Sequence, residues 1–254
     1  MSKVAAEAAP TANTTNYGWY TVGVLTIAYV FSFIDRSILT LLVGPIRVDL
    51  GISDTQVSLL HGLAFAIFYT LLGIPIASLA DRRNRRNIIA VGVTFWSIAT
   101  AACGLTRNFW QLFLARIGVG VGEAALSPAA YSMIADSFPP EKLGRALSVY
   151  TLGAIAGIGF ALIIGGAVIG TVMTSTDATL PLVGTVRPWQ VVFFIVGLPG
   201  LLVALWILTL REPERRRLPV AGEGSGLKPL LRYMRVHWQS YAAHLAGFAL
   251  LSIV

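Results

Sequence analysis

Four ionisable residues lie inside long apolar stretches of the sequence, where a charge is costly unless it has a partner or a function. Asp35 and Arg36 lie in one stretch, and Arg116 and Glu123 lie in another. If both stretches are helical, Arg116 and Glu123 share one face about 10 Å apart along the axis, because seven residues make nearly two turns. The neighbours Asp35 and Arg36 instead point about 100° apart, so each needs a partner on another helix.

This set of two acids and two arginines predicts a way of coupling protons to an anion. We expect Asp35 to pair with Arg116; Arg36 is expected to pair with Glu123 or with a substrate anion. Because no cation is spare, an incoming anion must compete with a carboxylate, and protonation of that carboxylate frees an arginine. Glu123 and Asp35 are therefore the predicted proton-coupling residues, and Arg36 and Arg116 are the predicted substrate-binding cations. The alternative is that all four form static ion pairs that fix the register of the helices.

Aromatic residues on the same helices are candidates for the apolar part of a binding cavity. Tyr29, Phe33 and Tyr150 are predicted to contact the substrate, and Phe65 and Tyr69 are further candidates for a lipid-shaped cavity. At helical spacing, aromatic residues more often pack in the core or face lipid, and that alternative stays open.

The elements that must position these residues are membrane-spanning helices. Hydrophobic residues make up 56% of the 254 residues and charged residues 12%, which is about half the charge of a typical soluble domain. Six segments reach the roughly 20 apolar residues that a spanning helix needs: 18–43, 57–80, 87–106, 109–136, 145–173 and 189–210. A seventh apolar run starts near Tyr241. The sequence therefore predicts an all-α membrane protein.

The remaining segments suggest a division of the chain into four parts. Residues 1–16 are predicted to be a disordered cytoplasmic tail, 17–210 a six-helix bundle, 211–238 a basic cytoplasmic linker with some amphipathic helix, and 239–254 the start of a truncated seventh helix. The arginines at 82, 83, 85 and 86, then Lys142 and Arg145, then the basic stretch from Arg211 all fall on one side of this topology. The positive-inside rule places that side, and the N-terminus, in the cytoplasm. We expect a multi-pass protein of the plasma (inner) membrane.

Composition also argues against other classes of function. The net charge of +7 is concentrated in short loops, which indicates membrane orientation and no nucleic-acid partner. With one cysteine and three histidines, neither a disulfide framework nor a Cys- or His-based metal site is expected, and no cofactor is predicted. The sequence has no constellation typical of an intramembrane hydrolase, so we expect no enzyme. A lipid enzyme and a non-transporting receptor or scaffold remain the alternatives from other classes.

Two motifs resemble signatures of the major facilitator superfamily. The loop after the second predicted helix reads Leu79-Ala80-Asp81-Arg82-Arg83-Asn84-Arg85-Arg86 and is similar to the family's Gly-x-Leu-Ala-Asp-Arg-x-Gly-Arg-Arg, with Ala77 and Asn84 in place of the glycines. Asn tolerates the left-handed backbone better than most residues, so this turn can survive the change. The fourth predicted helix supplies the second motif, Arg116-Ile117-Gly118-Val119-Gly120-Val121-Gly122-Glu123.

Within the superfamily, the chain resembles the Spinster-type branch, whose members move lysolipids and sphingoid phosphates. The resemblance lies in the Asp35-Arg36 pair and in the Gly-Val-Gly-Glu-Ala run followed by Pro128. It implies a proton-coupled secondary transporter of an amphipathic or organic anion that works by alternating access; an organic-acid, sugar-acid or drug carrier is the alternative. It also implies twelve helices in two halves, with the site between them near the midplane. We therefore expect the 254 residues to be the first half of a longer chain.

The same resemblance implies a cytoplasmic gate. In the superfamily, the Asp and Arg of the loop after helix two and an acid at the inner end of helix four latch the two halves together. The matching positions here are Asp81, Arg85 and Asp136, with Arg145 close by. Ordinary interfacial charge is the alternative for this group.

Overall fold

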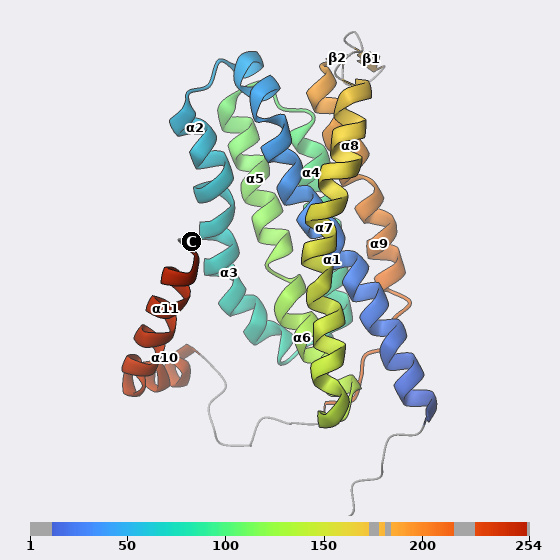
Figure 1. The fold of residues 1–254 in the computed structure, drawn as a ribbon, viewed down its shortest axis with the longest axis vertical. Helices are drawn as coiled ribbons and strands as arrows, with labels where there is room; N and C mark the ends of the chain where they lie inside the picture. Colours follow the sequence, from blue (N-terminus) through green and yellow to red (C-terminus); the bar gives the residue numbers. More distant parts are fainter. Residues whose placement is uncertain (1–11, 173–177, 181–183, 216–226, 253–254) are drawn as a thin grey trace, which may run out of the picture. The chain divides into compact units, whose positions relative to one another are not determined.

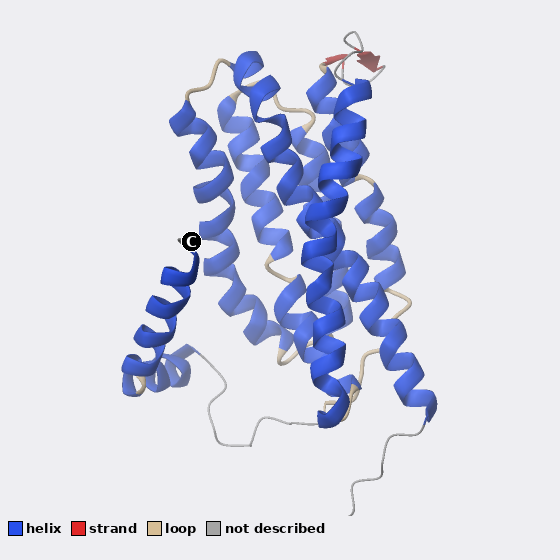
Figure 2. Ribbon diagram, viewed as in Figure 1, coloured by secondary structure: helices blue, strands red, loops and turns tan. Residues whose placement is uncertain are grey.

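The chain is almost entirely helical in the residues that the computed structural model describes, which are 12–172, 178–180, 184–215 and 227–252. Figures 1 and 2 show the helices α1 to α9 running side by side, with a small antiparallel hairpin between α7 and α8. In chain order the elements are α1 (Ala12–Leu50), α2 (Asp54–Ser58), the π-helix η1 (Leu59–Leu63), α3 (Ala64–Ala80), α4 (Arg85–Cys103), α5 (Phe109–Glu123), α6 (Leu126–Ser137), α7 (Pro140–Val172), β1 (Ala178–Leu180), β2 (Gly184–Val186), α8 (Pro188–Gly197), α9 (Pro199–Ile207), α10 (Leu227–Val236) and α11 (Trp238–Ser252).

Six helical stretches of the described residues are long and apolar enough to cross a membrane, and they match the six predicted segments. They are Asn16–Leu50, Asp54–Ala80, Arg85–Cys103, Phe109–Ser137, Pro140–Thr171 and Pro188–Ile207. The first helix begins at Ala12, inside the segment predicted to be disordered; residues 1–11 of that segment lie outside the described residues. The fifth span begins at Pro140, five residues earlier than predicted, because a proline is well tolerated in the first turn of a helix.

Close helix contacts depend on glycine, as two positions illustrate. Gly157 on α7 faces α1 so closely that an added Cβ would lie 2.6 Å from the Cβ of Phe33. Gly122 on α5 faces α4, where an added Cβ would lie 2.8 Å from the carbonyl oxygen of Gly92. Small residues allow this approach in a membrane, where no hydrophobic effect drives helices together. As a result, α7 packs along α1 (Figure 1), and α5 packs along α4.

The buried charges separate two apolar cores. On α1, the first core contains Val22, Val24, Leu25 and Ala28, and the second contains Ile38, Leu39, Leu42 and Ile46. On α5, Val119 belongs to the first core and Leu112 to the second. Asp35 falls between the two cores along α1, and Arg116 falls between them along α5. Both residues are 2% exposed, so the bundle contains a buried polar layer between two apolar cores.

The fourth span is interrupted next to Glu123. Helix α5 ends at Glu123, and α6 begins at Leu126. Pro128 explains the break, because it has no N–H to donate to the carbonyl group of Ala124, four residues earlier. Broken helices in membrane transporters commonly form binding sites, since the freed backbone groups can contact a ligand.

Residues 215–254 form a separate compact unit. Its described part contains α10 and α11. Helix α10 lies in the predicted linker, where an amphipathic helix is expected. Its Arg232 and Arg235 are exposed and lie among apolar residues. Helix α11 contains the start of the seventh apolar run.

Candidate substrate and proton site

Glu123 is the centre of the polar layer. Its carboxylate is buried at the end of α5, and its Oε2 atom accepts two hydrogen bonds from α1, one from Ser32 Oγ at 2.7 Å and one from Arg36 Nε at 2.6 Å. Its other oxygen, Oε1, is buried and has no hydrogen-bond partner among the described residues. The predicted contact between Arg36 and Glu123 is therefore present, and half of the carboxylate is left unsatisfied.

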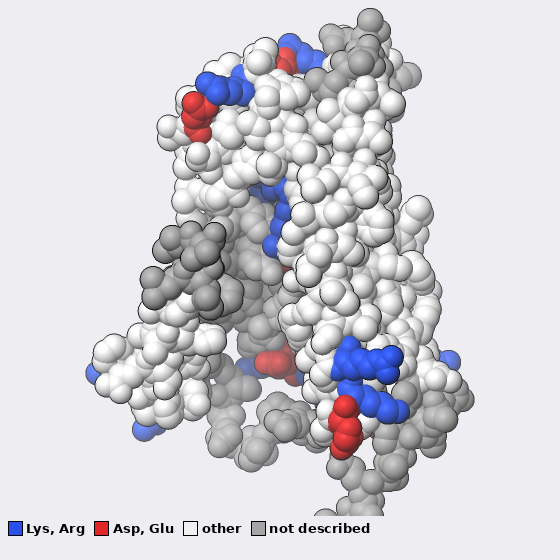
Figure 3. Space-filling view, viewed as in Figure 1, with Lys and Arg blue, Asp and Glu red and all other residues white. Residues whose placement is uncertain are grey.

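Arg36 combines this ion pair with an aromatic surround. Its guanidinium carbon lies 4.5 Å from the ring centre of Phe65 and 5.0 Å from those of Phe33 and Tyr69. Each ring face attracts the cation and shields it from lipid. The side chain is still 27% exposed, whereas that of Glu123 is fully buried. Arg36 is therefore the member of the pair that an incoming ligand can reach. Figure 3 shows basic atoms partway along the bundle, apart from the charges at its two ends.

Asp35 and Arg116 do not form the predicted ion pair. Asp35 Oδ2 accepts a hydrogen bond from Thr100 Oγ1 of α4 at 3.2 Å, and its Oδ1 has no hydrogen-bond partner in the described part of the chain. Nε and Nη1 of Arg116 are also buried without hydrogen bonds, and its guanidinium lies 5.9 Å from the Phe65 ring. The prediction failed because a hydroxyl on α4 supplies the bond that we assigned to the arginine. Both groups keep unused hydrogen-bonding capacity, which is costly in a buried site.

The predicted aromatic residues form a connected cluster beside Arg36. Tyr29 packs edge-on against Phe33 at 5.0 Å and stacks on Tyr150 at 4.6 Å, and Tyr131 packs edge-on against Tyr150 at 5.3 Å. Tyr150 is fully buried, and its hydroxyl has no hydrogen-bond partner within the ranges that the structure describes. In this conformation Tyr150 therefore supports Tyr29, while Tyr29 and Phe33 are the more accessible rings.

Among the residues predicted for the gate, Arg85 and Asp136 are joined. The Arg85 side chain is fully buried and forms ion pairs with Asp136 of α6 and, at 2.6 Å, with Glu212 after α9. It also donates to Ser132 Oγ and to the carbonyl oxygen of Pro213, both at 2.9 Å. Four hydrogen bonds from one guanidinium tie α4, α6 and the chain after α9 together.

The other two residues predicted for the gate lie outside this network of Arg85. Asp81 is exposed at the C-terminal end of α3. Arg145 is exposed on α7, and its guanidinium lies 5.6 Å from the ring centre of Trp19. The structure thus brings together two of the four predicted residues.

Sequence reasoning missed three neutral or distant partners. Ser32 precedes Arg36 by one helical turn, and this spacing is the only signal that could have identified it. Thr100 and Glu212 carry no such signal, since each reaches its partner only through tertiary packing. In the described part of the chain, no cluster of three or more His, Cys, Asp or Glu residues could hold a metal ion.

Comparison with known proteins identifies the family to which this chain belongs. The sequence profile of the Major Facilitator Superfamily matches residues 25–254, so the chain belongs to this superfamily. An MFS-type efflux pump of Mycolicibacterium smegmatis is 32% identical over 203 residues, covering 80% of this chain and 44% of the pump. A probable L-galactonate transporter of Escherichia coli is 29% identical over 195 residues, covering 76% of this chain and 40% of the transporter.

The resemblance to the Spinster type is also confirmed. The crystal structure of a bacterial homologue of the human lysosomal transporter Spinster, inward-facing and unoccupied, is 38% identical in sequence and superposes with a TM-score of 0.72. The match covers 87% of this chain and 49% of the solved chain. The chain therefore spans less than half the length of these relatives.

Proposed function

We propose that this chain forms half of a secondary transporter that moves an amphipathic or organic anion by alternating access, coupled to protons. One observation carries the proposal: a fully buried carboxylate, Glu123, shares one oxygen with Arg36, the cation that remains accessible. In the proposed topology the N-terminus is cytoplasmic, the membrane is the plasma (inner) membrane, and a second six-helix half completes the cavity.

The proposed coupling follows from competition for Arg36. An anion that approaches its guanidinium draws it away from Glu123, and the carboxylate then lies buried without its cation. Protonation removes that cost, because a neutral carboxyl group needs no counter-charge. Ser32 stays hydrogen-bonded in either state, since a hydroxyl group can donate or accept. Proton and anion therefore favour the same state of the site, which is the condition for symport of the two.

Asp35 is proposed as the second proton-coupling group, and Arg116 as a second cation for the anion. Both are buried and retain unused hydrogen-bonding atoms. Arg116 also shares the Phe65 ring with Arg36, at 5.9 and 4.5 Å respectively. An anion held between the two arginines would satisfy donors that the protein itself leaves unpaired.

The surroundings favour an amphipathic anion over a sugar acid. Phe33, Phe65 and Tyr69 surround the cation with ring faces, which suits an apolar tail next to a charged head. A sugar acid would instead require many hydrogen-bonding groups around its hydroxyls. The similarity to the probable L-galactonate transporter keeps the sugar acid as the second candidate. Asp81, with Arg85, Asp136 and Arg145, is proposed to act in the gate on the cytoplasmic side.

Counterflow in proteoliposomes tests this function. The full-length protein is reconstituted in vesicles preloaded with lysophosphatidylglycerol, and uptake of the labelled lipid is measured with and without a pH gradient. Saturable uptake that a pH gradient increases supports the proposal. Parallel vesicles with L-galactonate test the alternative, and the absence of counterflow with every anion would leave a receptor or scaffold.

A further inference from the structure

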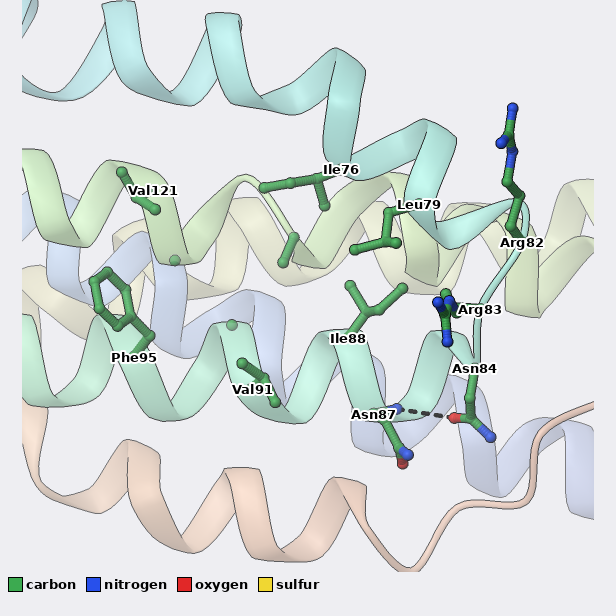
Figure 4. Close-up of a pocket in the computed structure, with 13 residues that line it drawn as sticks. Ile76, Leu79, Arg82, Arg83, Asn84, Asn87, Ile88, Val91, Phe95 and Val121 are labelled. Atoms are coloured by element: carbon green, nitrogen blue, oxygen red, sulfur yellow. Dashed lines mark hydrogen bonds between the residues drawn. The ribbon is translucent and has the colours of Figure 1, made fainter. Parts of the chain in front are cut away.

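A groove with a volume of about 830 Å³ lies between α3 and α4. Figure 4 shows Ile76 and Leu79 of α3 along one wall and Ile88, Val91 and Phe95 of α4 along the other. The walls are open to the outside, since Leu79 is 47% exposed and Val91 is 68% exposed. The volume falls within the roughly 300–1,000 Å³ typical of ligand sites.

The groove is separate from the site around Glu123. Val121 lines the groove, and Glu123 lies two residues further along α5, about 200° around the helix axis. The floor between them consists of small residues, Gly92, Gly122 and Ala125. The two sites therefore lie on opposite sides of α5, and a ligand in one does not contact the other.

The groove is apolar along its length and basic at one end. Its apolar residues belong to helices that are long and apolar enough to cross a membrane. Its other end lies at the loop between α3 and α4, where Arg82 and Arg83 are exposed and Asn84 and Asn87 are the neighbouring polar groups. None of the described residues that line it is acidic. Figure 4 shows Arg83 beside Ile88, at the end of the apolar wall.

We propose that this groove binds an anionic phospholipid of the surrounding bilayer. An acyl chain lies along the walls formed by α3 and α4, and the phosphate group is held at Arg82 and Arg83. Three features select this ligand: the apolar walls lie within spanning segments, the cations lie at the ends of those segments, and the groove opens outward. Basic pockets between transmembrane helices on the cytoplasmic side are suited to anionic lipid head groups, and arginine binds phosphate with a two-pronged fork.

Lipid retention by the purified protein tests the proposal. The full-length protein in detergent is incubated with phosphatidylglycerol or phosphatidylcholine of matched chains, and bound lipid is counted by native mass spectrometry. We expect a clear preference for phosphatidylglycerol. Arg82→Gln with Arg83→Gln should weaken phosphatidylglycerol binding about tenfold. Replacement of both by Lys should restore part of it, because lysine keeps the charge but loses the bidentate contact with phosphate.

A second, independent variant tests the apolar walls. Val91→Trp should fill the groove and lower binding of the lipid without changing charge. Ile98→Trp is the matched control, since Ile98 lies two turns along the same face of α4, is 55% exposed and does not line the groove. Lys142→Gln is the control for charge, at an exposed position on α7.

The outcomes are distinct. Loss of phosphatidylglycerol in the double Gln variant or in Val91→Trp, with retention in both controls, supports the site. Equal binding of the two lipids, or unchanged phosphatidylglycerol binding in both groove variants, overturns it. If one groove variant fails to fold, the other still decides, because the two substitutions perturb different ends of the groove.

Discussion

Arg36 and Glu123 meet through a single oxygen: Nε of Arg36 lies 2.6 Å from Oε2, and Oε1 has no hydrogen-bond partner among the described residues. A bidentate arginine–carboxylate pair uses both oxygens and is the stronger arrangement. The single-bonded pair observed here is easier to separate. The two terminal nitrogens of the Arg36 guanidinium lie further along the side chain than Nε, which makes the contact. An ion pair that only stabilises the fold benefits from two hydrogen bonds, whereas a pair that must separate during transport needs only one.

Glu123→Gln should abolish uptake driven by a pH gradient and leave part of the substrate exchange intact. Glutamine mimics the protonated carboxyl group in shape, and it can still hydrogen-bond to Ser32, but it cannot lose a proton. Asp35→Asn should behave similarly if Asp35 shares the coupled proton. The measurement is uptake in proteoliposomes against exchange in the same vesicles, with Glu141→Gln as a control at an exposed carboxylate. Full gradient-driven uptake in both variants would make these carboxylates structural.

Arg36→Lys should lower the affinity for the anion by about tenfold, while the protein still folds. Lysine keeps the charge but has a single point of contact, and it loses the flat surface that packs on Phe65 and Tyr69. We expect KM to rise more than kcat falls, because the interaction is with the bound anion. Arg47→Lys is the matched control, since this exposed arginine at the end of α1 pairs with Asp54 at 2.6 Å. Equal KM values in the two variants would remove Arg36 from substrate binding.

The parts of this structure that the sequence predicts are those set by composition along one helix. Twenty apolar residues in a row predict a span whatever its neighbours are. An arginine within such a span, like Arg36, must find an acid, of which few are available in the bilayer. Thr100 shows the limit. Whether Asp35 meets Thr100 or Arg116 depends on how far α1 and α4 are rotated about their own axes, and a uniformly apolar helix has no amphipathic pattern that fixes this rotation.

Glu212 shows the same limit at the end of the bundle. It lies beyond the sixth predicted helix, 127 residues from Arg85, and no periodicity connects the two. Sequence reasoning could match Arg85 and Asp136 through the resemblance to a family motif, but that motif contains no third partner.

Asp81→Asn should weaken the proposed gate and make cavity residues more accessible from the cytoplasmic side. Asp81 is exposed at the end of α3, so its substitution should have little effect on membrane insertion. The measurement uses a single cysteine at Tyr69, beside Arg36, in a background with Cys103→Ser. A membrane-impermeant thiol reagent is then applied from the cytoplasmic side. Faster labelling is expected in Asp81→Asn than with the native aspartate, and equal labelling with normal transport would exclude Asp81 from the gate.

We expect Arg85 to stabilise the fold, independently of its proposed role in the gate. Its fully buried guanidinium bridges Asp136 and Glu212 and also donates to Ser132 and Pro213. Removing one member of a buried ion pair costs about 3–5 kcal/mol, because the remaining charge is left without a partner. Arg85→Ala removes the cation that bonds to both Asp136 and Glu212 and should therefore lower the unfolding temperature markedly.

Two further substitutions separate the bridge from simple charge. Arg85→Lys keeps the positive charge but cannot reach both carboxylates and the Pro213 carbonyl at once, so it should be intermediate. Adding Glu212→Gln to Arg85→Ala removes the negative charge that loses its arginine and should recover part of the lost stability. Thermal unfolding followed by tryptophan fluorescence measures all three, with Lys142→Ala as the control for an exposed cation at another loop. If Arg85→Ala unfolds at the same temperature as this control, the network does not stabilise the fold, and a role in the gate is then the remaining explanation for it.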